Sequence, residues 1–160
     1  LVSNVDLAPT IFDLAGIEPP ADYRVDGRSF LPLLTGEGAY ERESVFLEIT
    51  TERAVVTDDG FKYVAVRYPP EIQAEVDEGT TYSHDCVERD EGEPARYAAD
   101  RDFPAYYDQD QLYDLESDPL EQDNLAGDPA YEDRLAEMRR LLGEYSRDLP
   151  HAFGEFAAEG

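Results

Sequence analysis

The sequence predicts an α+β protein in which a small antiparallel β-sheet of about four strands is covered by a long C-terminal helix. Three observations predict this fold class. Apolar residues alternate with polar ones in short segments between residues 44 and 66. Asp59-Gly60 separates two of these segments, as in a tight hairpin. A third pattern, apolar residues at helical spacing, runs from Tyr131 to Tyr145.

Composition limits the classes of partner. The chain has 160 residues, of which 41% are apolar, which is enough for a real core. Its net charge of -25 would repel nucleic acid and anionic membranes, so we expect neither as a partner. Lys62 is the only lysine, and acidic residues are dispersed through every segment. Such a surface indicates a high-salt environment, in a cytoplasmic or a secreted protein, although an ordinary acidic protein is the alternative.

The first element that the sequence predicts is a helix at the N-terminus. Asp6 is expected to cap it, Pro9 falls in its first turn, and Gly16 is a suitable stop. One face of this helix is apolar, comprising Leu7, Ile11, Leu14 and Ala15. A short helical turn follows, capped by Ser29 and closed by Gly36.

This N-terminal segment, residues 1–43, has no sheet of its own and cannot bury an apolar face alone. We therefore expect it to be the end of a larger α/β domain. Leu1 is not an initiator methionine, and the first residues do not resemble a signal peptide. The sequence is accordingly interpreted as truncated at this end.

Residues 44–150 are expected to form the second domain. Its predicted strands cover residues 44–50, 53–57, 61–66 and 111–115. Asp128 and Pro129 begin the last helix, as a cap and a first helical residue. The helix carries an apolar stripe that should cover the sheet, formed by Tyr131, Leu135, Met138, Leu142 and Tyr145. Residues 151–160 are predicted to be a loose tail.

An acidic insertion at about residues 67–110 has no sustained periodicity, and it is either a functional excursion or a solvated insertion. It holds the single cysteine, Cys86, next to His84 and Asp85. An inert loop cysteine is favoured over a reactive or metal-binding one, because no feature of the sequence would stabilise a thiolate there.

Four stretches together resemble the sulfatase family of the alkaline-phosphatase superfamily, over most of the chain except the insertion. They are Ser3–Ile17, Asp26–Gly36, the hairpin Arg53–Tyr63, and Gln111–Ala126, which is similar to the family's C-terminal signature. The resemblance implies a C-terminal subdomain with a four-stranded antiparallel sheet and a long helix. It also implies hydrolysis of sulfate esters by a formylglycine nucleophile, made within a Cys/Ser-x-Pro-x-Arg motif, with a divalent cation, usually calcium.

The chain departs from the family pattern at the catalytic positions. It contains no Cys/Ser-x-Pro-x-Arg motif, so we assign no catalytic residue. Asp123-Asn124 has the residue types of a metal-binding Asp-Asn pair but does not correspond to that pair in the family pattern. We assign no metal ligand either, and expect calcium to be bound outside these 160 residues. Many members carry an arginine where this chain has Val56, and Lys62 is interpreted as structural.

An anionic substrate favours arginine, which leaves four residues of the insertion as candidates for substrate binding: His84, Arg89, Arg96 and Arg101. The alternative for each of them is charge balance in a very acidic segment.

The sequence therefore predicts the C-terminal part of a sulfatase whose partner is its own N-terminal catalytic domain. The substrate would be a sulfated small molecule or glycan. A phosphodiesterase or phosphonate hydrolase of the same superfamily is one alternative. A non-catalytic accessory module is the other. By itself, the 160-residue fragment is expected to be inactive.

Overall fold

The computed structural model describes residues 1–79, 102–147 and 149–156. The chain divides into two compact units, Leu1–Val45 and Phe46–Gly160. Each unit has its own architecture and is described by itself. Within the described residues, no helix is both long and apolar enough to cross a bilayer.

The first unit contains the two helices that the sequence predicts. Helix α1, Leu7–Ala15, follows a short 3₁₀ turn and ends at Gly16, whose φ of 64° is left-handed. Glycine adopts this conformation without the steric cost that a Cβ would bring. Helix α2, Leu31–Thr35, begins beside Ser29, whose Oγ accepts a hydrogen bond from the Leu31 N–H at 3.3 Å.

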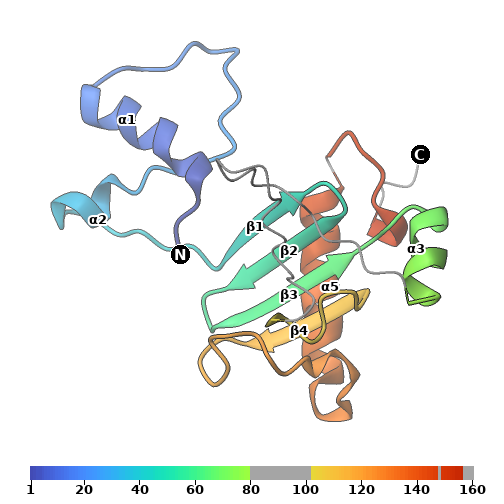
Figure 1. The fold of residues 1–160 in the computed structure, drawn as a ribbon. Coiled ribbons are helices and arrows are strands. Elements are labelled where there is room, and N and C mark those ends of the chain that lie inside the picture. The colour runs from blue at the N-terminus through green and yellow to red at the C-terminus, as the bar shows by residue number, and fades with distance from the viewer. Residues whose placement is uncertain (80–101, 148, 157–160) are drawn as a thin grey trace, which may run out of the picture. The chain divides into compact units, whose positions relative to one another are not determined.

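The second unit is built on a four-stranded sheet (Figure 1). Its strands are β1 (Ser44–Ile49), β2 (Glu52–Thr57), β3 (Phe61–Val66) and β4 (Asp110–Asp114), and they lie side by side in chain order. Strand β3 is antiparallel to both of its neighbours. Tyr63 lies opposite Val55 on β2 and Leu112 on β4, so that these three side chains meet on one face of the sheet.

The turn between β2 and β3 confirms the predicted hairpin. Gly60 takes a φ of 89°, and Leu115 donates a backbone hydrogen bond to the Gly60 carbonyl at 2.9 Å. Arg134 of the C-terminal helix reaches the same turn and pairs with Asp59 at 2.7 Å. The hairpin is thereby attached to both the sheet and the helix.

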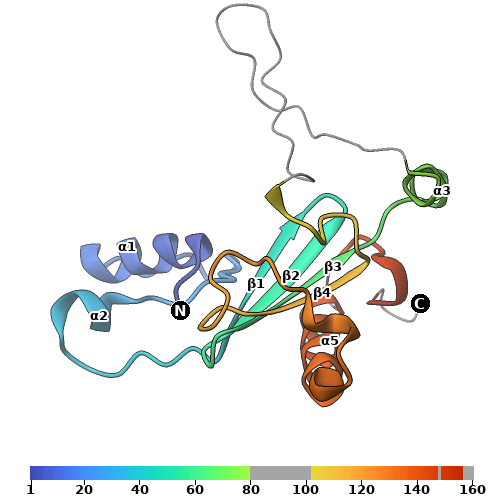
Figure 2. The ribbon, with the colours of Figure 1, turned by 60° about the horizontal axis from the view of Figure 1, so that its bottom comes forward.

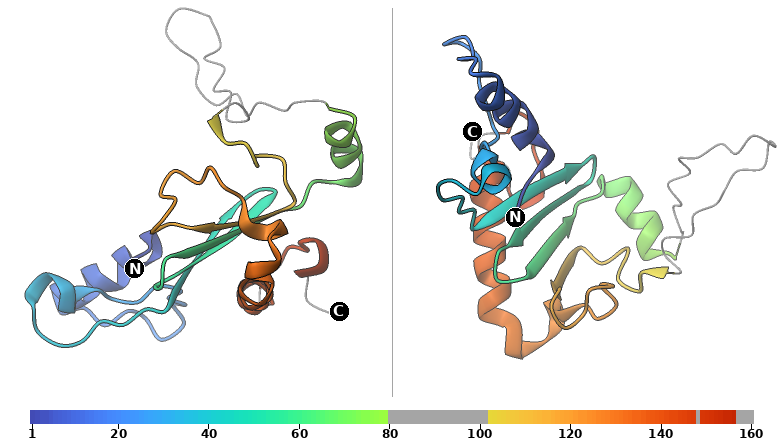
Figure 3. Two further views of the ribbon diagram at one scale, coloured as in Figure 1. Left: turned by 90° about the horizontal axis from the view of Figure 1, so that it is seen from below. Right: turned by 90° about the vertical axis from the view of Figure 1, so that its left-hand side faces the viewer.

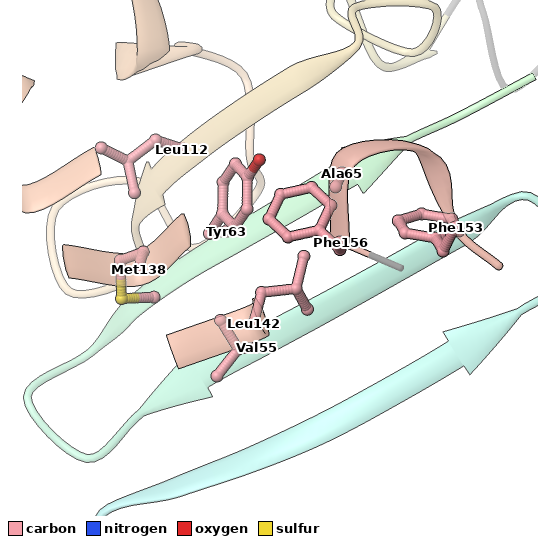
Figure 4. Packing of buried hydrophobic residues seen from close by; sticks show 8 residues of the cluster. All are labelled: Val55, Tyr63, Ala65, Leu112, Met138, Leu142, Phe153 and Phe156. Carbon is pink, nitrogen blue, oxygen red and sulfur yellow. The ribbon is translucent and has the colours of Figure 1, made fainter. Parts of the chain in front are cut away.

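Helix α5, Glu132–Ser146, lies across one face of this sheet, as predicted (Figures 2 and 3). Asp128 accepts a hydrogen bond from Ala130 and caps a 3₁₀ turn that leads into the helix. The core between helix and sheet is shown in Figure 4 and includes Val55, Tyr63, Ala65, Leu112, Met138, Leu142, Phe153 and Phe156. The predicted stripe therefore covers the sheet through its central residues.

Two predictions are corrected by the structure. A helix, α3 (Pro70–Asp77), lies within the segment for which no periodicity was found. Pro70 at its first position and Ile72 and Val76 at helical spacing were the available signals. The tail predicted to be loose is also wrong up to Phe156, because both of its phenylalanines are buried in the core. The two phenylalanines are separated by Gly154 and Glu155, so no apolar run or period predicted their burial.

Candidate functional site

The first unit is organised around the carboxylate of Asp6, which is fully buried. Its Oδ1 accepts hydrogen bonds from the Arg28 backbone N–H at 2.8 Å and from the Arg42 guanidinium at 2.6 Å. Its Oδ2 accepts from the Ser3 N–H at 2.7 Å and, more weakly, from the Tyr40 hydroxyl at 3.4 Å. We call Asp6 and these four partners the Asp6 joint.

The predicted role of Asp6 as the side-chain cap of α1 is therefore wrong. Asp6 stands at the capping position, but its side chain makes no capping hydrogen bond to that helix. It instead joins the start of α1 to segments more than 20 residues away. Burial tends to raise the pKa of Asp6, but the hydrogen bonds from Arg28 and Ser3 and the charge of Arg42 outweigh it and lower the pKa below its ordinary value.

A second contact at the Asp6 joint is possible only because residue 27 is a glycine and has no side chain. The backbone of Gly27 lies so close to Val5 that a Cβ at position 27 would stand 2.0 Å from the Val5 carbonyl oxygen. Thr10 completes the contact, because its hydroxyl donates to the Asp6 carbonyl at 2.7 Å and accepts from the Phe30 N–H at 3.0 Å. Two of the stretches that resemble sulfatases, around Asp6 and around Gly27, thus meet through polar contacts.

The apolar face of α1 is not covered within its own unit. Ile11 and Leu14 are each 60% exposed, and Leu7 is 54% exposed. The joint holds the polar side of the helix against the 27–30 segment and leaves its apolar side available. Large exposed apolar surfaces of this kind mark interaction sites.

The C-terminal signature folds around Asn124. Its Oδ1 accepts hydrogen bonds from the backbone N–H groups of Leu112 at 2.9 Å and Ala126 at 3.0 Å. Its Nδ2 donates to Asp108 at 2.9 Å and to the Asp110 carbonyl at 3.0 Å. The amide group therefore holds the connector after β4 back onto that strand. Asn124 thus has a structural role in this fold, through partners on β4 and on the connector.

Replacement of Asn124 by alanine should lower the free energy of unfolding of the second unit by about 2 kcal/mol, because two partly buried N–H donors lose their acceptor. Urea unfolding followed by circular dichroism measures this loss, with and without added calcium. The neighbouring Asp123→Ala, at an exposed position, should change stability by less than about 0.5 kcal/mol. A calcium-dependent stabilisation of the wild type that both variants abolish would contradict the structural role.

Lys62 is held on the sheet by an ion pair with the same connector. Its Nζ lies 2.8 and 2.7 Å from the two carboxylate oxygens of Glu121, and both side chains are about three-quarters buried. Glu121 has a φ of 56°, which is unusual for a residue with a side chain. Lys62 therefore has a structural partner, as the sequence indicated, and Val56 lies opposite it on β2.

The four residues predicted to bind substrate, His84, Arg89, Arg96 and Arg101, lie outside the described residues. The same is true of Cys86. In the described ranges 1–79, 102–147 and 149–156, no group of three or more His, Cys, Asp or Glu side chains is arranged to hold a metal ion. The structure brings Asp6 together with Ser3, Arg28, Tyr40 and Arg42, and the sequence did not indicate this grouping.

No protein-family model matches the chain. A protein from Bacteroides thetaiotaomicron assigned to the sulfatases matches 88% of the chain with 30% sequence identity and a TM-score of 0.54. A 2-O GAG sulfatase matches the same share with 30% identity and a TM-score of 0.53. A phosphonate monoester hydrolase of Agrobacterium radiobacter matches 92% with a TM-score of 0.52. Its identity is 24%, so it shows the fold alone.

The matched region is only part of each neighbour. The chain covers 23% of both sulfatases and 25% of the phosphonate monoester hydrolase. In this chain, the four-stranded antiparallel sheet and the long C-terminal helix are the elements that the resemblance implied. In fold and in sequence, the chain corresponds to the C-terminal portion of the sulfatase family, within the alkaline-phosphatase superfamily.

Proposed function

We propose that this chain is the C-terminal part of a hydrolase that cleaves sulfate esters, and that the nucleophile and the metal ligands belong to the remainder of that protein. The observation that carries the proposal is the 30% identity over 88% of the chain to each of two proteins of the sulfatase class. The stretches that resemble the family support it, because Asn124 of the C-terminal signature and Lys62 of the hairpin both have defined structural partners in the fold.

The partner of the chain under this proposal is the catalytic α/β domain of the same protein. The exposed face of α1 supplies a surface for that contact, since Ile11 and Leu14 would otherwise leave a large apolar area in water. The Asp6 joint fixes the helix from its polar side. The role of the first unit would then be to present a rigid apolar face to the catalytic domain.

Calcium, bound by the catalytic domain, would polarise the sulfate group and stabilise the charge that develops on its oxygens. The described residues of this chain contain no cluster suited to hold the ion. Under this proposal, the described residues of this chain contribute by supporting the catalytic domain and not by binding the metal ion. The arginines of the insertion, Arg89, Arg96 and Arg101, together with His84, are proposed to contact the anionic substrate, which would be a sulfated small molecule or glycan.

A glycan substrate has some support among the neighbours. One of them is a 2-O GAG sulfatase, and another, with 25% identity, was solved with its substrate D-glucosamine-2-N,6-O-disulfate. The competing function is phosphonate or phosphate ester hydrolysis, because the phosphonate monoester hydrolase shares the fold.

The proposal is tested with the complete protein that contains this chain. We expect it to release inorganic sulfate from an aryl sulfate in a calcium-dependent manner, with a formylglycine detectable by peptide mass spectrometry. The 160 residues expressed alone serve as the control and should release none. Preferential cleavage of a phosphonate monoester by the complete protein would favour the competing function. Calcium-dependent sulfate release by the 160 residues alone would contradict the placement of catalysis outside this chain.

A further inference from the structure

The C-terminal segment His151–Phe156 is held on the second unit by two arginines. The first, Arg53 of β2, is almost fully buried. Its guanidinium carbon lies 4.5 Å from the centre of the Phe153 ring, and its Nη2 donates to the His151 carbonyl at 3.2 Å. Glu48 neutralises the same guanidinium at 2.6 Å. This arginine therefore binds the segment through a ring and a carbonyl oxygen, without help from a carboxylate of the segment.

The second arginine, Arg67, binds the segment through charge. Its Nε and Nη2 donate to the two carboxylate oxygens of Glu155 at 2.9 and 2.6 Å. Arg139 of α5 donates to the same carboxylate at 2.7 Å. Both guanidiniums also lie near the Phe156 ring, at 5.4 and 5.8 Å from its centre. Glu155 is thus the acidic group through which the segment connects β3's end to the long helix.

The rest of the second unit, which we call the body, has its own carboxylate partner for both Arg67 and Arg139. Asp110 of β4 pairs with Arg67 at 3.0 Å and, through its other oxygen, with Arg139 at 3.0 Å. The Tyr63 hydroxyl also donates to Asp110. If Glu155 left, both arginines would keep one carboxylate partner on the sheet. The body can therefore remain folded without the segment's charge.

Among the described residues, the backbone of the segment forms few hydrogen bonds with the body. The Phe156 N–H donates to the Phe153 carbonyl inside the segment, and the His151 carbonyl accepts from Arg53. The segment contains one 3₁₀ turn, Gly154–Phe156, and no β-strand or α-helix of the described residues extends into it. Gly154 has a φ of 49°, and a Cβ there would stand 3.1 Å from Arg67 Cδ, so the segment lies directly against that side chain. Two rings and one carboxylate provide its main attachment.

We propose that His151–Phe156 is a detachable latch, which closes over the helix–sheet core while Glu155 is ionised and opens as a unit from a folded body when that charge is removed. The groups that face Glu155 are Arg67 from the end of β3, Arg139 from α5, and, behind them, Asp110 and Tyr63 of the sheet. Opening would uncover the core residues on which Phe156 and Phe153 pack, Tyr63 among them.

The direction of the pH dependence follows from the two arginines. The hydrogen bonds and charge of Arg67, helped by the charge of Arg139, lower the pKa of Glu155 from 4.5 to about 2 against the opposing effect of burial. A carboxyl group with a depressed pKa stabilises the closed state fully above its ordinary pKa. That contribution is lost as the pH falls from about 4.5 towards 2. The latch is therefore expected to open in acid.

Hydrogen exchange of the 160-residue chain, read by mass spectrometry and corrected for intrinsic rates at each pH, tests the latch. Glu155→Gln should raise the open fraction of residues 151–156 about tenfold at pH 7, the effect being limited by the partial exposure of the pair. The control is Glu144→Gln, a similarly exposed carboxylate on α5 that pairs with Arg140. It should leave the segment unchanged.

Two comparisons decide the outcome. In the wild type, segment protection should fall below pH 4.5 while the amides of β2 and β3 stay protected, and in Glu155→Gln it should be low at every pH. Loss of segment and strand protection at the same pH would overturn the proposal, because the segment would then be an inseparable part of the core. Equal protection in the Glu155 and Glu144 variants would overturn it as well.

Discussion

Replacement of Gly27 by alanine should unfold the first unit and leave the second folded. The added Cβ would stand 2.0 Å from the Val5 carbonyl oxygen, 2.4 Å from its carbon and 2.8 Å from the Asp6 nitrogen. All three are backbone atoms, which cannot move aside as a flexible side chain can. We expect a loss of more than about 3 kcal/mol, at the upper end of overpacking effects. The hydrogen bond from Arg28 to Asp6 would be lost with it.

The measurement is hydrogen exchange of α1 amides, compared with those of β2 and β3. Gly127→Ala is the control for the added methyl group, because no atom lies within 4 Å of its Cβ position. Gly16→Ala controls for backbone strain within the first unit, because its φ of 64° is unfavourable but its surroundings are empty. Retention of α1 protection in Gly27→Ala would show that the close approach is not required.

The elements that could be predicted from the sequence are those determined by residues close together in the chain. The positions of strands β1 to β4 and helix α5 followed from the pattern of apolar residues along the chain. In β1, Leu47 and Ile49 are 48% and 70% exposed, so the alternation there predicted the strand but not a buried face. Gly60 revealed its hairpin because the positive φ is a property of the residue itself. The burial of Leu142 and Met138 was likewise contained in the helical spacing of the stripe.

The Asp6 joint could not be found in this way. Asp6 next to a helix start fits the cap pattern, and nothing in the local sequence shows that Arg28 and Arg42 approach it. The approach depends on a tertiary contact made possible by Gly27, whose φ is ordinary. A glycine beside an Asp suggested only a turn. The contact depends on residues far apart in the sequence, so neither local propensity nor periodicity predicts it.

The latch was missed for a related reason. Phe153 and Phe156 are separated by a glycine and a glutamate, a pattern that matches neither a strand nor a long helix. Their burial depends on Arg53 and Arg67, which lie about 100 and 90 residues earlier in the sequence. Single aromatic anchors at chain ends have no periodicity to reveal them. The sequence therefore indicated a loose tail where the structure has a docked one.

Replacement of Asp6 by alanine should destabilise the first unit by about 3–5 kcal/mol, as for other buried ion pairs that lose one partner. Arg42, which is 12% exposed, would be left with an uncompensated charge, and the Ser3 and Arg28 N–H groups would lose their acceptor. Asp6→Asn keeps the size but replaces one acceptor oxygen by a donor that faces other donors, so it should also destabilise the unit. The measurement is again the protection of α1 amides, with β2 and β3 as the internal reference.

The pH dependence separates the charge of Asp6 from its size. Because the pKa of Asp6 is lowered in the folded unit, its contribution is complete above the ordinary value of 3.8 and is lost as the pH falls below that value. The wild-type first unit should therefore lose stability in acid. Asp6→Asn should show a smaller acid-dependent loss over the same range, since the residue that titrates has been removed.

A double-mutant cycle of Asp6 and Arg42 measures how much the interaction between these two side chains contributes to the stability of the first unit. Arg42→Met removes the guanidinium and keeps an apolar stem, so the double variant Asp6→Ala/Arg42→Met no longer holds an unpaired buried charge. Its stability should be lower than that of the wild type by less than the sum of the two single losses, because the two side chains are in direct contact at 2.6 Å. Additive losses would mean that Asp6 acts through the Ser3 and Arg28 backbone alone. In that case the closure of the first unit would depend on the hydrogen-bonded turn and not on the charge pair.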